Sequence, residues 1–205
     1  MRHGTVGRFT RGLLAVGLLL AVALSAQENR TRIRITKMDF RTVRTPLFRD
    51  TTNPDATSDY EWLQVYLEYE TEGGRKGWAD EISIEWALLV RPPNAKPMLM
   101  QATTTYVDVE EGKHRAVMYV RPAFIRRHCE SKTPNKSYFA AYVEMAADGQ
   151  RLARQEYSRS NQPKNWWRAK EPDVRLMDGE LLAPEDTPFA CMDYDFYEHP
   201  KKKSE

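Results

Sequence analysis

The stretch Ile82-Ser83-Ile84-Glu85-Trp86-Ala87-Leu88-Leu89-Val90 decides the fold class of this chain. Every second position from Ile82 to Val90 is apolar, and Pro92 and Pro93 follow the run. Because successive side chains of a strand point to opposite faces, this alternation predicts a strand with one buried face. Trp86 lies in the middle of the buried face and is expected in the core, where immunoglobulin-like sandwiches commonly hold a tryptophan.

Similar short runs recur along the chain and are separated by Gly, Pro, Asn and Asp, which favour turns. Between Ile35 and Met38 the alternation shifts by one residue, which indicates a bulge. Only the stretch from Ala123 to Cys129 is compatible with a short helix. The sequence therefore predicts an all-β, immunoglobulin-like, two-sheet antiparallel sandwich of about seven strands, with runs near residues 33–40, 63–69, 82–90, 99–109, 117–120, 139–145 and 151–157.

Two turn dipeptides predict hairpins. Asp148-Gly149 lies between two alternating runs, and both residues tolerate the positive φ that a two-residue hairpin needs. Glu111-Gly112 separates the runs 99–109 and 117–120, which are expected to pair in the same way.

The first 26 residues read as a secretory signal peptide. Three arginines precede an apolar run from Leu13 to Leu24, and small residues end at Ala26. The run is shorter than the ~20 residues that span a bilayer, so cleavage near Gln27 is favoured over an uncleaved anchor. We expect an exported protein with no membrane span after cleavage, in the periplasm, on the outer-membrane surface or outside the cell.

Charge weighs against nucleic acid as a partner. Of the 31 basic side chains, three are arginines of the signal segment, which leaves 28 against 29 acidic ones. The basic balance of the whole chain therefore belongs to the leader, and no strongly basic face is expected.

The mature chain is expected to hold one domain, residues 27–157, and a C-terminal extension, residues 158–205. The alternation stops at Ser158, yet Trp166, Trp167 and Phe189 are too apolar for a solvated linker. We expect the extension to pack on the sandwich as ordered coil to about Cys191 and to be flexible beyond it.

The cysteines and histidines give no catalytic or metal centre. Cys129 and Cys191 are predicted to form a disulfide, because the chain is exported and has no other cysteine. A catalytic pair of His128 and Cys129 is disfavoured, since neighbours on an extended chain point apart. His114 lies beside a turn, and no short ligand spacing indicates a metal. No cofactor is expected, and the acidic residues at 193, 195 and 198 read as a solvated tail rather than a calcium site.

Aromatic residues are the candidate binding groups. They lie on the face opposite the predicted core or in the extension, where they could stack on sugars or be covered by the extension itself. The candidates are Trp62, Tyr66, Tyr138, Tyr142, Trp166 and Trp167.

The motif Thr187-Pro188-Phe189-Ala190, followed by Tyr194, Asp195 and Tyr197, resembles a group of exported proteins from mucin-associated verrucomicrobial gut bacteria. One similar protein is encoded beside type IV pilus components and has an immunoglobulin-like fold related to archaeal pilus-type proteins. The resemblance implies the same sandwich and a role in pilus assembly or at the host-facing surface. It assigns no functional residue.

The leading hypothesis is thus a non-enzymatic protein of the cell envelope or pilus that binds a protein partner. The alternative is a carbohydrate-binding module, with a glycan as partner. An unpaired sheet edge or a large apolar patch would favour the protein partner, and an exposed row of aromatics would favour sugar. A closed pocket that holds His114 or His128 beside an acid would point to an enzyme.

Overall fold

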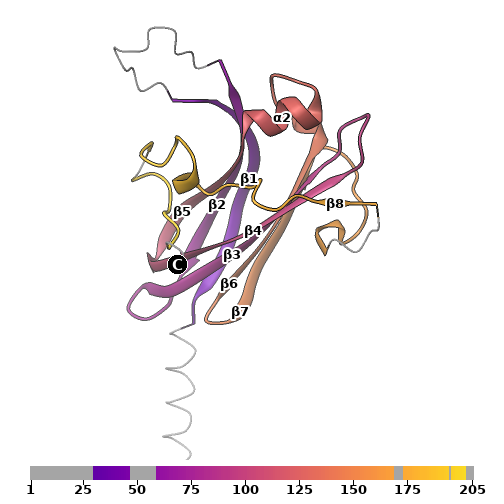
Figure 1. Cartoon of the computed structure of the whole chain (residues 1–205). Coiled ribbons are helices and arrows are strands. Elements are labelled where there is room, and N and C mark those ends of the chain that lie inside the picture. The colour runs from indigo at the N-terminus through magenta and orange to yellow at the C-terminus, as the bar shows by residue number, and fades with distance from the viewer. Residues whose placement is uncertain (1–29, 47–58, 169–172, 194, 202–205) are drawn as a thin grey trace, which may run out of the picture.

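The computed structural model of the chain describes residues 30–46, 59–168, 173–193 and 195–201, so the predicted signal peptide lies outside the described residues. These residues form the predicted all-β sandwich (Figure 1). Within them, no helix is both long and apolar enough to cross a membrane. The elements are β1 (Arg32–Arg44), β2 (Glu61–Glu72), β3 (Trp78–Val90), β4 (Met98–Glu110), β5 (Gly112–Val120), α2 (Pro122–Cys129), β6 (Phe139–Ala147), β7 (Gln150–Ser158) and β8 (Arg175–Leu176), with short 3-10 helices at Lys136–Tyr138, Trp166–Arg168 and Pro184–Asp186.

The strands form two sheets that face each other. The small sheet has the order β1-β2-β5, and the large sheet has the order β7-β6-β3-β4-β8. All pairs are antiparallel except β4 with β8, which is parallel. The register of β1 against β2 shifts between Ile35 and Lys37, where the sequence predicted a bulge.

One of the two predicted hairpins forms. Asp148 and Gly149 have φ of 52° and 70° and join β6 to β7. The predicted hairpin of β4 with β5 is wrong, because β4 pairs with β3 while β5 pairs with β2 in the other sheet. The chain changes sheets at Glu111, whose N–H donates to Gly77 O at 2.7 Å. The next residue, Gly112, has φ 144°, a conformation that favours glycine.

Trp86 is a core residue, as predicted. It is 3% exposed, and its indole N–H donates to Thr104 Oγ1 at 2.9 Å, so the one polar atom of the ring is satisfied. Alternate residues of both sheets surround it. The largest fully buried side chains include Tyr66, Tyr69, Tyr106, Tyr119, Phe40, Phe139, Leu63, Leu67, Ile82 and Ile84.

On one side of the sandwich, β1 and β7 bring the two sheets together directly. The ring of Phe40 packs edge-on against Phe139 and Tyr157, with centroids 6.0 and 5.1 Å apart. The Tyr157 hydroxyl donates to Asp39 Oδ1 at 3.1 Å. Strand residues alone therefore seal this side.

On the other side, between β4 and β5, the C-terminal tail (residues 158–205) closes the gap. Figure 1 shows the yellow chain passing across these strands. Leu182 exchanges two backbone hydrogen bonds of 2.8 Å with Tyr119 of β5, and Leu181 and Ala183 join the main core. We call this side of the sandwich the open side, because its closure depends on coil.

The tail stays on the sandwich beyond Cys191, where flexibility was expected. Glu198 N–H donates to Arg115 O of β5 at 2.8 Å, and Lys201 N–H donates to Thr105 O of β4 at 2.6 Å. These bonds satisfy backbone edge groups of two strands. The lysines at 202 and 203 lie outside the described residues.

The predicted disulfide is not formed, since both cysteines are free. Cys129 ends α2 and belongs to the core between the sheets. Cys191 is exposed, two residues after Phe189, which packs on the outer face of the small sheet with Trp62 and Tyr119. The small sheet thus lies between the segments that carry Cys129 and Cys191. Export of the chain was therefore not sufficient to predict a disulfide between them.

Candidate functional site

The six candidate aromatics do not form an exposed row. Four of them are buried, and Tyr138 and Trp167 are half-buried. The rings are therefore not arranged as a row of exposed stacking platforms, and the tail contacts Trp62 and Tyr142, as the alternative anticipated. The buried rings are Trp62, Tyr66, Tyr142 and Trp166, which are 8%, 2%, 6% and 4% exposed.

Two tail segments provide this cover. On the large sheet, Trp167 stacks on Tyr142 with centroids 4.1 Å apart and an interplanar angle of 4°, while Trp166 Nε1 donates to Glu156 Oε1 at 2.6 Å. On the small sheet, Phe189 stacks on Tyr119 at 4.6 Å and meets Trp62 edge-on at 5.5 Å. Stacked and edge-on pairs are the favoured aromatic geometries, so the rings serve to hold the tail.

His128 and Cys129 do not make an activated nucleophile. Burial raises the pKa of the Cys129 thiol to about 11, which keeps it protonated at neutral pH. Burial, with Arg127 and Arg175 nearby, lowers the pKa of His128, whose ring lies 4.5 Å from that of Phe124. The hollow beside them has about 20 Å³, which is room for about one water molecule.

His114 ties β5 to the tail. Its ring is 8% exposed and stacks on Tyr69 at 5.2 Å. Nδ1 lies 2.6 Å from Glu198 Oε1, and Nε2 lies 2.7 Å from Glu110 O and 3.0 Å from Thr71 Oγ1. Both ring nitrogens are thus engaged within the protein, and the geometry gives this histidine a structural role. Among the described residues, no group of three acids, cysteines or histidines is placed to hold a metal ion.

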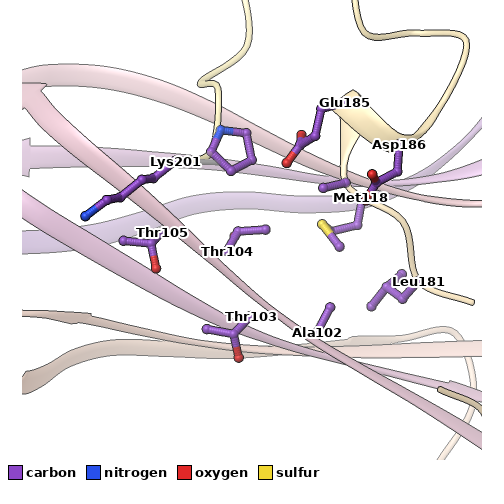
Figure 2. A pocket seen from close by; sticks show the side chains of 11 residues that line it. Ala102, Thr103, Thr104, Thr105, Met118, Leu181, Glu185, Asp186 and Lys201 are labelled. Atoms are coloured by element: carbon purple, nitrogen blue, oxygen red, sulfur yellow. The ribbon is translucent and has the colours of Figure 1, made fainter. Parts of the chain in front are cut away.

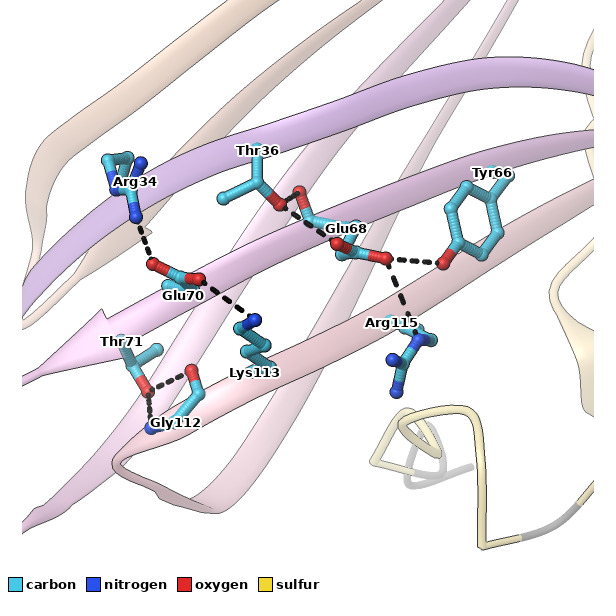
Figure 3. Close-up of polar contacts among 9 residues, drawn as sticks. All are labelled: Arg34, Thr36, Tyr66, Glu68, Glu70, Thr71, Gly112, Lys113 and Arg115. Atoms are coloured by element: carbon cyan, nitrogen blue, oxygen red, sulfur yellow. Dashed lines mark hydrogen bonds and ion pairs between the residues drawn. The ribbon is translucent and has the colours of Figure 1, made fainter.

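The exposed half of the small sheet carries cross-strand rows of charge (Figure 3). Glu70 of β2 pairs with Arg34 of β1 and, at 3.9 Å, with Lys113 of β5. In the next row, Glu68 accepts from the Tyr66 hydroxyl at 2.9 Å and pairs with Arg115 at 3.7 Å.

The charged and hydroxyl groups of these rows pair with one another. The hydrogen bond from Tyr66 and the nearby Arg115 lower the pKa of Glu68, while burial and Glu68 raise the pKa of Tyr66. Positive and negative groups alternate across the three strands, which stabilises cross-strand pairs. The surface therefore lacks the single-sign potential that attracts a highly charged partner.

The open side holds a hollow that could take a ligand. A hollow of about 420 Å³ lies between β4, β5 and two passes of the tail (Figure 2). Threonines of β4 and apolar side chains of β5 and the tail line it, and Glu185 and Asp186 from the tail lie across from Lys201 at its rim. The lining consists of Ala102, Thr103, Thr104, Thr105, Met118, Leu181, Ala183, Glu185, Asp186, Pro200 and Lys201.

The edge of β4 runs along this hollow, and the tail is bonded to it on either side of Gln101 and Thr103. Leu99 O accepts from Met177 N–H at 2.9 Å, and Thr105 O accepts from Lys201 N–H at 2.6 Å. In a strand, alternate residues direct both backbone groups to the same edge, so Gln101 and Thr103 present theirs outward too. Within the described part of the chain, neither residue has a backbone partner on that edge.

The tail leaves this edge at a specific turn. After β8, Asp178 and Gly179 form a turn in which Gly179 has φ 69°, and the chain then crosses to β5. Among the described residues, the tail makes no backbone–backbone hydrogen bond to Gln101 or Thr103, although the Gln101 side chain donates to Trp167 O at 3.1 Å. We call Gln101–Thr105 together with the hollow the β4 site.

Sequence reasoning found the strand but missed the site. A usable signal was the run Thr103-Thr104-Thr105, because polar β-branched residues suit a strand that faces water on one side. No sequence pattern indicated the hollow, because the tail residues that line it lie 80 to 100 positions after Gln101 in the sequence.

Comparisons with known proteins agree with this architecture. A crystal structure of a protein from Akkermansia muciniphila superposes with a TM-score of 0.75 over 85% of this chain and 95% of that chain. The two sequences are 19% identical, so the likeness shows the shared fold. No curated protein matches the chain. A family model matches residues 24–204, nearly the whole chain after its first segment. The chain therefore belongs to the family that its C-terminal motif resembles.

Proposed function

We propose that this chain is an exported, non-enzymatic protein of the cell envelope or pilus that binds a protein partner by adding one of the partner's strands to β4. The single observation that carries the proposal is the uncovered edge at Gln101 and Thr103 beside a hollow of about 420 Å³. The signal-like first segment and the family support export and pilus association.

Physical reasoning favours a strand as the occupant. An uncovered edge offers backbone donors and acceptors at regular spacing, and a partner strand satisfies both sets at once. Alternate side chains of that strand would enter the hollow, which supplies selectivity. Val107, two residues beyond Thr105 on β4, is 41% exposed, so an apolar side chain lies next to this end of the edge.

The carbohydrate alternative has less support. Sugar-binding sandwiches use exposed flat rings, whereas four of the six candidate rings are buried here. The charged rows of the small sheet already engage each other. We therefore retain the protein partner as the proposed function.

Site-specific photocrosslinking in cells that export the protein tests the proposal. A photoreactive residue replaces Thr103 in one variant and Asp148, in the exposed β6–β7 turn, in a matched control. We expect protein adducts from position 103 that disappear when Gln101→Pro removes an outward N–H. Equal adducts from both positions, or adducts that survive Gln101→Pro, would contradict strand addition.

A further inference from the structure

The last part of the tail crosses from β5 to β4, and its contacts indicate how access to the β4 edge is controlled. We call residues 195–201 the strap; two of them line the hollow. We propose that the strap is a displaceable latch, which competes with the partner strand for β4 and is locked by a proton shared between His114 and Glu198. This inference rests on the proposed function and concerns the regulation of the same site.

The strap occupies an acceptor that a partner strand needs. Lys201 N–H donates to Thr105 O at 2.6 Å, and Figure 2 shows Lys201 beside Thr105 at the rim of the hollow. While this bond is made, a partner strand can pair only with Gln101 and Thr103. That stretch is short, since strands usually have about 3–10 residues. Release of the strap extends the available edge to Thr105 and removes Pro200 and Lys201 from the wall of the hollow.

Few contacts hold the strap, so it can open without unfolding the sandwich. Among the described residues it makes one backbone hydrogen bond to β5, from Glu198 N–H to Arg115 O at 2.8 Å, and one to β4 through Lys201. A partner strand would make several such bonds to one edge. No side chain of residues 195–201 is buried, and Phe196, which packs on the Arg115 guanidinium at 4.2 Å, is 46% exposed. Segments with few buried contacts open locally at a low free energy.

The contact between His114 and Glu198 holds the strap only when it contains a proton. His114 Nε2 lies 2.7 Å from Glu110 O, which can only accept, so this nitrogen carries a hydrogen. In a neutral ring Nδ1 would then be bare, and it lies 2.6 Å from Glu198 Oε1. Two acceptors at that distance repel each other unless a proton lies between them. The closed strap therefore holds one proton that a free carboxylate and a neutral imidazole release, so opening is favoured as the pH rises.

The tyrosines around this contact remain neutral. Tyr69 of β2 stacks on the His114 ring at 5.2 Å, and burial, with Glu198 and Tyr106 nearby, raises the pKa of Tyr69 well above its usual value. Burial, with Glu185 and Glu198 nearby, also raises the pKa of Tyr106 of β4. Between pH 6 and pH 8, neither tyrosine changes its charge, so neither contributes to a pH dependence of the strap.

Amide hydrogen exchange of the full exported chain tests the proton lock. The exchange of the Lys201 amide, corrected for its intrinsic rate, measures how often the strap leaves Thr105. We expect opening to increase from pH 6 to pH 8 by up to about tenfold per pH unit, the limit for release of one proton. Glu198→Gln places an amide donor against the bare nitrogen and should remove this dependence. His199 also titrates in this range, so His199→Gln is the matched control and should keep it. A parent chain without pH dependence, or a Glu198→Gln chain that retains it, would overturn the lock.

Photocrosslinking from position 103 in exporting cells tests the competition with the partner. Lys201→Pro together with Glu198→Ala removes the N–H that the strap gives to β4 and the proton lock. We expect about threefold or more protein adducts in this variant, because a larger fraction of the chain is competent to bind. Asp195→Ala, at an exposed position of the strap, is the control and should leave the yield unchanged. Equal yields from the parent and the opened variant, both lost with Gln101→Pro, would overturn the latch and leave strand addition standing. No adducts from either chain would overturn both.

Discussion

The two lateral sides of the sandwich are closed by different means. Between β1 and β7, the rings of Phe40, Phe139 and Tyr157 interlock, and all three belong to strands. Between β4 and β5, the tail supplies Leu181 and Ala183 to the core and leaves part of the β4 edge uncovered. Closure by strands fills the space between the sheets, whereas closure by coil leaves a hollow beside the edge of β4.

The largest expected effect comes from removing the closure of the open side. A chain that ends at Tyr157 loses Trp166, Leu181 and Phe189, which are all buried. Each such side chain contributes about 1.5–3 kcal/mol, so the loss of roughly 5–9 kcal/mol is comparable with the whole stability of a typical domain. We expect an aggregating product without a cooperative unfolding transition, as monitored by circular dichroism in urea.

A chain that ends at Lys201 is the control for this truncation, since it keeps every described contact of the tail. It should unfold at the same urea concentration as the full exported chain. Cooperative unfolding of the shorter chain at that same midpoint would show that the strands close the open side without the tail.

The next effect concerns the sealed side. Phe40 is 0% exposed, and Phe40→Ala should lower the free energy of unfolding by about 3–5 kcal/mol, as aromatic truncations in packed cores do. The described ring contacts that seal this side all come from strands, so the resistance of the tail to native-state proteolysis should stay nearly unchanged. Preferential release of the tail in this variant would mean that the two sides are coupled.

A smaller effect is expected where the tail meets the small sheet. Phe189 is 9% exposed and stacks on Tyr119, so Phe189→Ala should cost about 1–3 kcal/mol. Because the tail can detach locally, trypsin should cleave it sooner in this variant. Met192→Ala, at a residue that is 41% exposed, is the matched control and should change stability by less than about 0.5 kcal/mol.

The contrast also explains which features could be predicted from the sequence. Alternation identified the long strands, the core position of Trp86 and the Asp148–Gly149 hairpin, because each is a local property of one or two strands. It could not assign β4 and β5 to different sheets, since alternation reports which face of a strand is buried and not which strand lies beside it.

The burial of the candidate aromatics could not be predicted, for a related reason. β2 is buried on both faces, with Leu63, Val65 and Leu67 toward the core and Trp62 and Tyr66 under or beside the tail. Alternation that places Trp62 and Tyr66 opposite the core says nothing about a coil segment that returns from more than a hundred residues away. The β4 site depends on that same coil and was therefore beyond local reasoning.

The smallest effect on stability, and the sharpest check on the path of the tail, comes from the two thiols. The core position of Cys129 raises its pKa to about 11, so at pH 8 only roughly one thiol in a thousand is the reactive thiolate. Cys191 is exposed in a turn of the tail. We expect one thiol of the native, unreduced exported chain to react rapidly with Ellman's reagent, and two to react after denaturation in urea. Cys191→Ser should abolish the rapid reaction and leave the urea midpoint within error of the parent chain.

If no thiol reacts even after denaturation, the two cysteines are bonded. The segment after Phe189 would then have to reach the core side of the small sheet, and the closure of the open side would differ from that described here.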